Sequence, residues 1–258
     1  LVVGHFNHRL RGRASTADEQ LVEQFCQNHQ LPFHTAKWKQ DSAAIKKHGL
    51  EMAARKARYD FLKSTARKTR CRLIVTAHHA DDQAETFLWR LMRGAGGKGL
   101  GGTQALSTIS RKLKLQLARP LLHFTKTDLI SAAKLASIRF RKDASNNDPK
   151  HLRNKIRTQL VPYLKRYFHP EIEHSIHQSQ TLVAADADFA AQYAQAWLQD
   201  SSSVPFGELH IAIQRWVLWH QIIDLGFSPQ FFMIEELRAH ADRPFSINPQ
   251  KQLQRDTH

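Results

Sequence analysis

The sequence is poor in cysteine and has neither a long apolar run nor a leader. Cys26 and Cys71 are the only cysteines among 258 residues, and no CxxC spacing occurs. Two cysteines without this spacing are too few for a thiolate zinc site or an iron–sulfur cluster. Two free thiols suit a reducing compartment, so we expect a cytoplasmic protein. No apolar run approaches the roughly 18 residues of a membrane span, so we expect no membrane partner.

The chain also starts without a methionine and without the basic segment that opens a signal peptide. Its first residues, Leu1-Val-Val, already lie in an apolar run that is typical of a buried strand. We therefore expect that the natural protein has a longer N-terminus than this sequence. The abrupt end after Ile247-Asn-Pro is consistent with a shortened C-terminus as well.

Acidic residues are absent from Thr86 to Thr127, although that stretch is rich in Lys and Arg. The whole chain has a net charge of +15, with 38 Lys and Arg against 23 Asp and Glu. Solvated basic faces are common, but a long acid-free stretch favours a polyanionic partner such as nucleic acid. The excess lies in the first two thirds, because residues 200–258 carry more acidic than basic side chains.

Polar residues gather between Cys71 and Gly102, at a predicted strand-to-helix turn. An apolar strand begins at Arg72, and a helix with Phe87 and Leu91 on its apolar face follows. The polar residues between and within them are His78, His79, Asp81, Asp82, Glu85 and Thr86. Ligands bind at the carboxyl ends of strands in open α/β sheets, which favours a ligand or metal site here. A plain helix N-terminus capped by Asp82 is the alternative.

A second candidate site lies on a helix predicted over residues 50–66. Arg55, Arg58 and Tyr59 share one face of this helix at i, i+3 and i+4 spacing. One interpretation is a solvated basic face, which such spacing often gives. The other is an anion site, because the two guanidinium groups would repel each other without a bound anion.

The remaining segments predict an α/β region that is followed by helices. Strands are expected at 1–8, 31–38 and 113–119, and the strand–helix–strand order of the first 38 residues predicts a parallel pair. Glycines from Gly94 to Gly102 predict a loop too flexible to pack. Helices are expected from Ser15 or Thr16, from Thr125 or Thr127 to Ser137, over 154–164 with an interruption at Pro162, from Pro170 to Trp197, and over 209–225 and 231–240.

These elements predict an α/β fold with a doubly wound, mostly parallel sheet, followed by a small all-α domain. We expect three parts, at residues 1–145, 146–200 and 201–258. A polar loop is expected at 143–149 and a linker at 201–205. Five aromatic residues are expected in the core of the last part: Trp216, Trp219, Phe227, Phe231 and Phe232.

Seven motifs occur in a fixed order along the chain. They are His5-Phe-Asn-His-Arg-Leu-Arg-Gly, Glu51-Met-Ala-Ala-Arg-Lys-Ala-Arg-Tyr, His78-His-Ala-Asp-Asp-Gln-Ala-Glu-Thr, the glycine segment from Arg93, Arg119-Pro-Leu-Leu, Asp143-Ala-Ser-Asn and Arg153-Asn-Lys-Ile-Arg. In this order the chain resembles the tRNA(Ile)-lysidine synthetases, a family of the PP-loop ATP pyrophosphatase superfamily. The resemblance is strong over about residues 1–170 and implies an adenine nucleotide α-hydrolase-like fold.

The resemblance implies a ligase that joins free lysine to the wobble cytidine of a tRNA(Ile) with a CAU anticodon. ATP and Mg²⁺ would serve to adenylate the cytidine, and lysine would then displace AMP. Catalysis is assigned to Asp81, Asp82, Glu85 and Arg55, with Asp81 and Asp82 as metal ligands. ATP binding is assigned to His78, His79, Arg58, His5 and Asn7, and tRNA binding to Arg93, Lys98, Arg153 and Arg157. Residue chemistry alone does not say which carboxylate has which role.

One motif of the family, the SGGxDS pyrophosphate loop, is missing. It would follow a strand just before Leu1, and its backbone N–H groups would hold phosphates. We expect that truncation explains its absence, and that the chain as given binds tRNA but is inactive as an enzyme. The alternatives are a non-catalytic tRNA-binding relative that has lost the loop, and another PP-loop tRNA-modifying enzyme. A thiolase of that superfamily would need a closely spaced cysteine pair for its cluster, whereas this chain has only the isolated Cys26 and Cys71.

Overall fold

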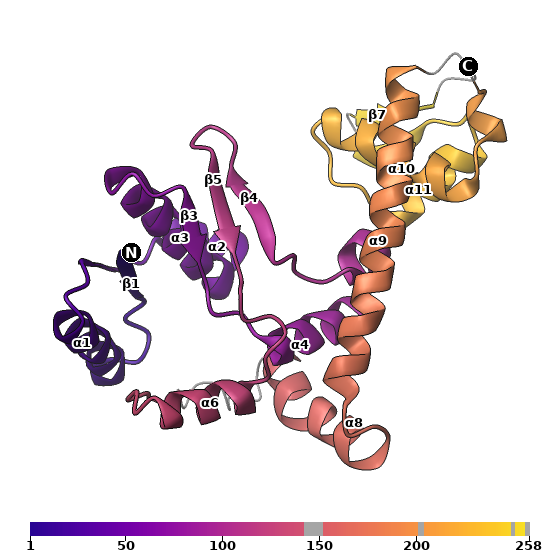
Figure 1. Ribbon diagram of the computed structural model, residues 1–258. Helices are drawn as coiled ribbons and strands as arrows, with labels where there is room; N and C mark the ends of the chain where they lie inside the picture. Colours follow the sequence, from indigo (N-terminus) through magenta and orange to yellow (C-terminus); the bar gives the residue numbers. More distant parts are fainter. Residues whose placement is uncertain (142–151, 201–203, 249–250, 256–258) are drawn as a thin grey trace. The chain divides into compact units, whose positions relative to one another are not determined.

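The computed structural model describes residues 1–141, 152–200, 204–248 and 251–255. Its first 38 residues form the predicted strand–helix–strand unit. The unit consists of β1 (Val3–Asn7), α1 (Arg13–Asn28) and β2 (Phe33–Lys37) (Figure 1). The two strands are parallel, with Val3 opposite Phe33 and Asn7 opposite Lys37, which confirms the predicted parallel pair.

The start of α1 differs from the prediction. The helix begins at Arg13, and Gly12 at φ 50° is its N-cap, whereas Ser15 and Thr16 lie inside the helix. A positive φ suits glycine, which lacks the Cβ that would clash in this conformation. The Ser15 hydroxyl instead accepts a hydrogen bond from the Arg11 N–H at 3.2 Å. The prediction of a Ser15 or Thr16 cap was therefore wrong.

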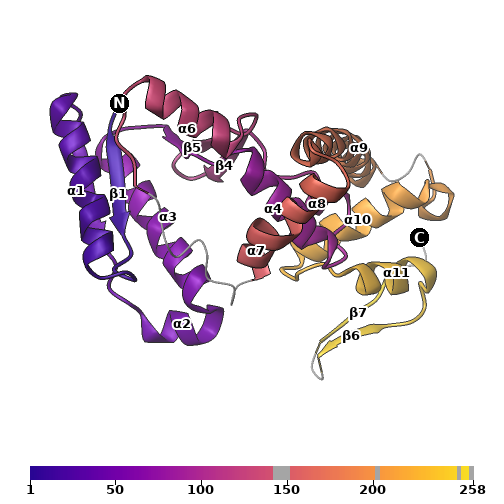
Figure 2. The ribbon, with the colours of Figure 1, turned by 90° about the horizontal axis from the view of Figure 1, so that it is seen from below.

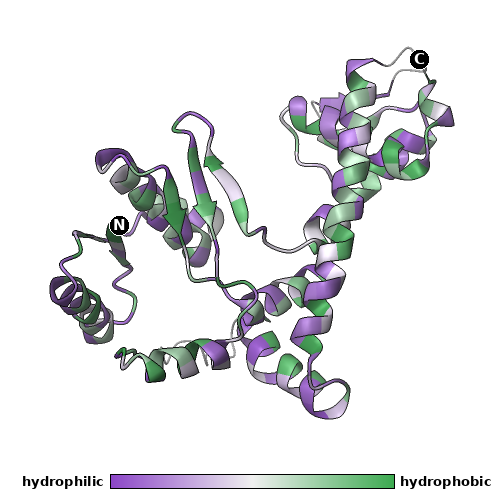
Figure 3. Ribbon diagram, in the orientation of Figure 1, coloured by the Kyte–Doolittle hydropathy of each residue, from purple (hydrophilic) through white to green (hydrophobic). Residues whose placement is uncertain are grey.

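The second half of the α/β region contains helices α2 (Ser42–His48) and α3 (Leu50–Lys68) and strands β3 (Leu73–Val75), β4 (Leu106–Ser110) and β5 (Leu115–Ala118). The strand order is β3-β5-β4, with β5 parallel to β3 and antiparallel to β4. Strand β4 was not predicted. Figure 3 shows the apolar residues of β3 and β5 in green, and Ile74, Leu115 and Leu117 are buried against Ala66 of α3.

Helix α3 packs on strands of both small sheets. A Cβ at Gly4 of β1 would lie 3.2 Å from the Leu62 side chain, and Ala66 packs on Ile74 of β3. The α/β class and the parallel pairs agree with the prediction. The strands of this region form a two-stranded and a three-stranded sheet, rather than one continuous sheet, in the described residues.

The glycine segment forms a packed element, which corrects the prediction of a flexible loop. Helix α4 (Ala80–Leu91) is followed by a short helix, α5 (Gly97–Leu100). A Cβ at Gly97 would lie 3.1 Å from Ala187, and one at Gly101 would lie 2.9 Å from the Cβ of Ala184. Both alanines belong to the long helix α9 (Ile172–Gln199). These glycines therefore permit a close backbone approach.

Thr125 begins the next helix, as one of the two predicted alternatives. Helix α6 (Lys126–Leu135) has a capping box in which Thr125 and Asp128 exchange hydrogen bonds. After residues 142–151, which lie outside the described ranges, three helical segments follow: α7 (Leu152–Lys155), the π-helix η2 (Ile156–Leu160) and α8 (Val161–Tyr167) (Figure 2). Pro162 lies in the first turn of α8, directly after the π-helix η2, so the regular helix predicted over 154–164 is interrupted close to this proline. The loop predicted at 143–149 lies outside the described residues.

The last part contains η3 (Phe206–Glu208), α10 (Ile211–Asp224), α11 (Phe231–Ala239), β6 (Phe245–Asn248) and β7 (Lys251–Leu253). The hairpin of β6 and β7 was not predicted, so this part is not all-α. Trp216, Trp219 and Phe227 pack against its core, as expected. Phe231 and Phe232 are 67% and 65% exposed, so their prediction as core residues was wrong. Most of the linker predicted at 201–205 lies outside the described residues.

The contacts divide the chain into two compact units. The first unit contains residues 1–89 and 103–177, and the second contains residues 90–102 and 178–258. Each unit has its own buried apolar cluster. The three-part division at residues 145 and 200 stays a prediction. None of the described helices is long and apolar enough to cross a membrane.

Candidate functional site

The predicted polar cluster lies where β3 passes into α4. Thr76 to His79 connect the strand to the helix, and parallel β3 and β5 place their carboxyl ends at the same edge of the sheet. The Asp82 carboxylate accepts a hydrogen bond from the His79 N–H at 3.1 Å. This contact satisfies one of the free N–H groups at the start of a helix. The capped-helix interpretation therefore accounts for part of what Asp82 does.

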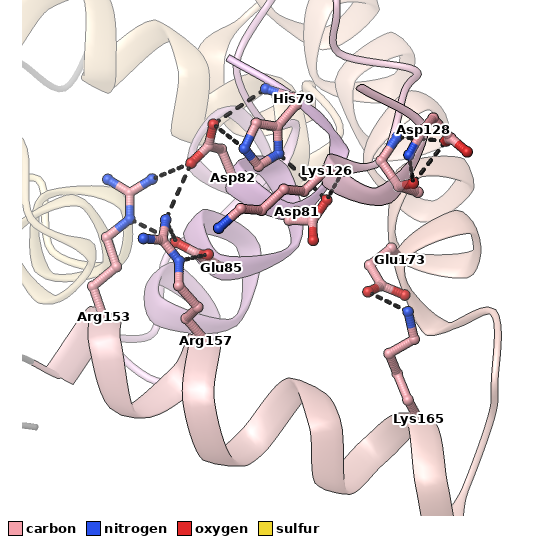
Figure 4. Close-up of polar contacts among 11 residues, drawn as sticks. His79, Asp81, Asp82, Glu85, Lys126, Asp128, Arg153, Arg157, Lys165 and Glu173 are labelled. Carbon is pink, nitrogen blue, oxygen red and sulfur yellow. Dashed lines mark hydrogen bonds and ion pairs between the residues drawn. The ribbon is translucent and has the colours of Figure 1, made fainter. Parts of the chain in front are cut away.

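Asp81 connects α4 to the start of α6 (Figure 4). Its Oδ2 accepts a hydrogen bond from the Lys126 N–H at 2.8 Å and lies 3.3 Å from Nδ1 of His79. Burial alone would raise the pKa of Asp81, but the contacts with His79 and Lys126 outweigh it and lower the pKa to about 2. The contact of His79 with Asp81 raises the pKa of His79, against the effect of burial. Asp81 is therefore ionised at neutral pH.

Glu85 lies one turn further along α4 and is 1% exposed. Arg153 of α7 and Arg157 of η2 bind the Glu85 carboxylate (Figure 4). Nε of Arg153 lies 3.0 Å and Nη2 of Arg157 lies 2.9 Å from Oε2 of Glu85. Both guanidinium groups also lie within 3.5 Å of Oδ1 of Asp82. The structure thus joins two carboxylates of α4 to two cations of α7 and η2.

This network gives Arg153 and Arg157, predicted to bind tRNA, a second role. Burial lowers the pKa of Arg157, but its hydrogen bond to Glu85 raises it more, so Arg157 stays charged beside its partner. Glu85 is buried and covered by the two arginines. Its contacts are those of a residue that positions Arg153 and Arg157.

A second group of cations lies beside the same turn. His78 contacts the Thr76 hydroxyl through Nδ1 at 2.9 Å. Burial lowers the pKa of His78, Asp82 partly opposes this, and three arginines lower it further. These arginines are Arg55, Arg58 and Arg119. We call these three arginines, which lie around His78, the cationic cluster.

The cationic cluster includes both predicted arginines of α3. Arg55 and Arg58 lie 5.0 and 5.4 Å from the ring centroid of Tyr59. Burial lowers the pKa of Arg58, Tyr59 partly opposes this, and the charge of Arg55 lowers it further. Among the described residues no carboxylate forms an ion pair with either arginine. Close cations without a carboxylate partner are the usual setting for a bound anion.

Arg119 was not predicted as a site residue, although its motif was. It follows β5 directly and is 8% exposed, and its Nη1 donates to the Gln104 carbonyl at 2.7 Å and to the Ser107 hydroxyl at 3.1 Å. Its position after a strand that pairs in parallel with β3 was the signal that could have found it.

The predicted ATP ligands of β1 lie on the face of the strand that meets α1. Both N–H groups of the Asn7 amide are used, by Glu19 at 2.7 Å and by the Ser15 carbonyl at 3.3 Å. Burial lowers the pKa of His5, against the charge of Glu19. His8 was not predicted, and burial lowers its pKa, with Arg58 adding to the effect. Successive residues of a strand point to opposite faces, so His5 and Asn7 share one face and His8 points to the other. His8, on which Arg58 acts, is therefore a better neighbour of the cationic cluster than His5 or Asn7.

The residues present fit a magnesium site at Asp81 better than at Asp82. No group of three or more His, Cys, Asp or Glu side chains in the described ranges is arranged to hold a metal ion. Mg²⁺ needs fewer protein ligands, because it binds one or two carboxylates together with phosphate oxygens and water. The Asp81 side chain is ionised and 31% exposed, whereas Asp82 faces two guanidinium groups.

The other two residues predicted to bind tRNA belong to the second unit. Nζ of Lys98 lies 4.4 Å from the ring centroid of Trp219 and 5.6 Å from that of Trp216. Arg93 lies in the exposed turn that follows α4. Lys98 therefore has an aromatic partner within its own unit.

Known proteins resemble this chain in sequence. A family model described as the PP-loop domain matches residues 1–164. A tRNA(Ile)-lysidine synthase of Geobacter sulfurreducens is 42% identical over 188 residues, which cover 72% of this chain and 38% of that protein. The tRNA(Ile)-lysidine synthase of a Nostoc species is 34% identical over 270 residues, which cover 95% of this chain and 75% of that protein.

A solved structure resembles the chain in fold. It is the U34-tRNA thiolase NcsA from Methanococcus maripaludis with its 4Fe-4S cluster, which matches with a TM-score of 0.57 and 14% identity over 72% of this chain and 62% of its own. This likeness concerns the fold alone, and it confirms the predicted α/β class.

The chain spans half or less of the length of several relatives, with 38% of the Geobacter protein and 50% of one from Rhodopirellula baltica. The PP-loop model nevertheless covers more than half of this chain, and the Nostoc protein is matched over three quarters of its length. The chain therefore belongs to the PP-loop domain family and, within it, to the tRNA(Ile)-lysidine synthases.

Proposed function

We propose that this protein uses ATP to join free lysine to the wobble cytidine of a tRNA(Ile) with a CAU anticodon, forming lysidine. The C2 oxygen of the cytidine attacks the α-phosphate of ATP and releases diphosphate, and the ε-amine of lysine then displaces AMP from the adenylated base. Membership in the tRNA(Ile)-lysidine synthases supports this proposal. ATP and tRNA as substrates also support a place in the cytoplasm.

The cationic cluster is the observation that carries the proposal. Adenylation transfers a group from a triphosphate, so the site needs positive charge that is fixed before ATP arrives. Arg55 and Arg58 provide it, because no carboxylate of the described residues pairs with either of them. Arg119 is held in place by two hydrogen bonds and adds a third cation. We assign the ATP phosphates to these residues and to His78, with His8 in place of His5 and Asn7.

The carboxylates of α4 divide into two roles in this proposal. Asp81 is ionised and partly exposed, so it is suited to hold the lysine ammonium group or a cation. Mg²⁺, when bound there, would offset negative charge on the phosphates. His79, whose pKa is raised by Asp81, lies between Asp81 and Asp82 and fixes their orientation. Glu85 acts through Arg153 and Arg157 as a positioning residue, and the more exposed Arg153 is the better candidate for a tRNA phosphate.

The distribution of charge supports a tRNA partner for the first unit. This unit has 30 Lys and Arg against 14 Asp and Glu, whereas the second has 8 against 9. Phosphate contacts supply most of the non-specific affinity for nucleic acid. We also propose that residues 1–145 carry the ATP chemistry and that residues 146–200 connect them to a separate part at 201–258.

The direct test uses protein to which a first strand and an SGGxDS loop have been added ahead of Leu1, and supplies it with ATP, Mg²⁺, radiolabelled lysine and a CAU-anticodon tRNA(Ile) transcript. We expect label in the tRNA and release of AMP. Arginine and ornithine should replace lysine poorly, because chain length determines where the attacking nitrogen lies. A protein that binds the tRNA but forms no AMP would instead be the non-catalytic relative.

A matched pair of substitutions on α3 tests the cationic cluster. Arg58→Gln should reduce AMP formation about 100- to 1,000-fold, the loss seen when one preorganised donor is removed. Arg67→Gln removes an exposed arginine from the last turn of the same helix and should leave the rate within about twofold. Equal rates for Arg58→Gln and the unaltered protein would place the phosphates elsewhere.

A further inference from the structure

Three large aromatic side chains lie exposed at the end of α8. Tyr163, Tyr167 and Phe168 are 54%, 60% and 69% exposed. Their rings contact one another, with centroids of Tyr163 4.9 Å from Tyr167 and 5.8 Å from Phe168. Contiguous exposed aromatic surface marks an interaction site more often than chance exposure does. We call these three residues the aromatic cluster.

The surroundings of the aromatic cluster are cationic. Cζ of Arg166 lies 5.2 Å from the ring centroid of Tyr167, and no carboxylate of the described residues forms an ion pair with Arg166. Lys165 is the other cation of this turn, and it is bound to Glu173 at 2.9 Å. From Leu152 to His169 the chain has five Lys and Arg and no acidic residue. The cluster is therefore open to an anionic partner.

The chemistry of this surface favours RNA over a protein partner. Unpaired bases stack on aromatic rings, and arginine adds a cation–π contact or binds the adjoining phosphate. The unit that contains the cluster has a net charge of +16, from 30 Lys and Arg against 14 Asp and Glu, so an anionic partner is attracted to it. A protein partner would need an acidic surface to complement the same residues.

The aromatic cluster also lies close to the candidate site along one helical run. Arg157, which binds Glu85, lies in η2, and α8 continues from it without a break. At about 1.5 Å per residue, Tyr163 lies about 9 Å beyond Arg157 along the helix axis. Tyr163 and Tyr167 are four residues apart and so share one face of the helix.

We infer that Tyr163, Tyr167 and Phe168 form a platform on which unpaired bases of the tRNA substrate stack, with Arg166 on an adjoining phosphate. This inference rests on the proposed function, because it takes tRNA as the substrate. It adds a contact that depends on ring surface, which the arginines predicted from the sequence would not supply.

The test measures the Kd for a tRNA transcript in a variant that lacks one aromatic ring of the cluster and in matched control variants. Tyr167→Leu keeps apolar bulk but removes the ring, and it should raise the Kd for the tRNA transcript about five- to one-hundred-fold. Tyr167→Phe keeps the ring and should bind within about twofold of the unaltered chain. Phe189→Leu removes an aromatic residue of the second unit that is 71% exposed and should also leave the Kd unchanged. Equal melting temperatures would show that all variants fold.

Salt dependence separates stacking from charge. Tyr167→Leu should leave the slope of log Kd against log salt unchanged, whereas Arg166→Gln should reduce it by about 0.7–0.9. If the unaltered chain binds no tRNA, both this inference and the proposed function fail. If it binds tRNA and Tyr167→Leu binds equally well, the platform alone is refuted. A change in oligomeric state, with tRNA affinity unchanged, would make the cluster a contact between chains and would also refute it.

Discussion

Glu85 and its two arginines show how a buried charge becomes acceptable in this fold. The carboxylate is removed from water, which is unfavourable unless cations and hydrogen bonds replace the lost solvation. Arg153 and Arg157 supply both, and Asp82 balances their second charge. Asp81 differs from Glu85, because a backbone N–H and an imidazole stabilise it and part of it stays open. Two neighbouring carboxylates of one helix thus have different chemistry.

The Asp81–His79 pair should make stability depend on pH in a defined window. Asp81 has its pKa lowered from 3.8 to about 2, so its contribution is present above about pH 4 and lost as the pH falls towards 2. His79 has its pKa raised from 6.5, so its contribution is complete below pH 6.5 and lost as the pH rises through the raised value. Asp81→Asn should therefore destabilise the protein most near pH 5, by about 1–2 kcal/mol after solvent screening.

Urea unfolding of both proteins between pH 2 and pH 8 measures this difference. Asp60→Asn is the control, since it removes an exposed ion pair with Lys56 and should give a smaller loss at every pH. A difference between Asp81→Asn and the unaltered protein that stays constant from pH 2 to pH 8 would contradict the assigned pair.

Among the elements, local patterns predicted most helices and strands, but not what they pack against. The β1–α1–β2 unit and the Thr125 cap follow from short-range signals, and they are present. The pairing of Glu85 with Arg157 spans 72 residues, and no local pattern contains it. Phe231 and Phe232 are apolar, yet they lie on the exposed side of α11. Their position could not be predicted, because helix periodicity alone does not say which face of a helix meets the core.

The glycine segment gives the sharpest prediction at this scale. Gly101 has φ −58°, which any residue adopts, so only the contact with α9 decides the effect of a Cβ there. Gly101→Ala would place that Cβ 3.0 Å from Cα of Ala184, and we expect a loss of about 1–3 kcal/mol from overpacking. Gly96→Ala meets no atom within 4 Å and should change stability by less than about 0.5 kcal/mol. Equal unfolding midpoints of the two variants in urea would show that the glycines serve another purpose.

For the whole molecule, the two units differ in charge and in core. The first unit is strongly basic and the second is close to neutral. Ile222 is 2% exposed in the core of the second unit, and Ile74 is 7% exposed in that of the first. Separate cores do not require the units to unfold together.

We therefore expect two calorimetric transitions that respond to different substitutions. Ile222→Ala and Ile74→Ala should each destabilise their own unit by about 2–5 kcal/mol, through lost burial and a cavity. Each should lower one transition and leave the other within about 1 °C. Tryptophan fluorescence should follow mainly the second unit, which holds Trp197, Trp216 and Trp219. A single transition that both substitutions lower equally would mean that the units unfold as one.

The ion pairs of Glu85 also set the order in which the site is completed while the chain is being made. Glu85 leaves the ribosome 72 residues before Arg157, and at about 5–20 residues per second this delay is roughly 4–14 seconds. During that time the Glu85 carboxylate lacks the two cations that make its burial favourable. We therefore expect Glu85 to stay exposed to solvent on the nascent chain until η2 has been synthesised.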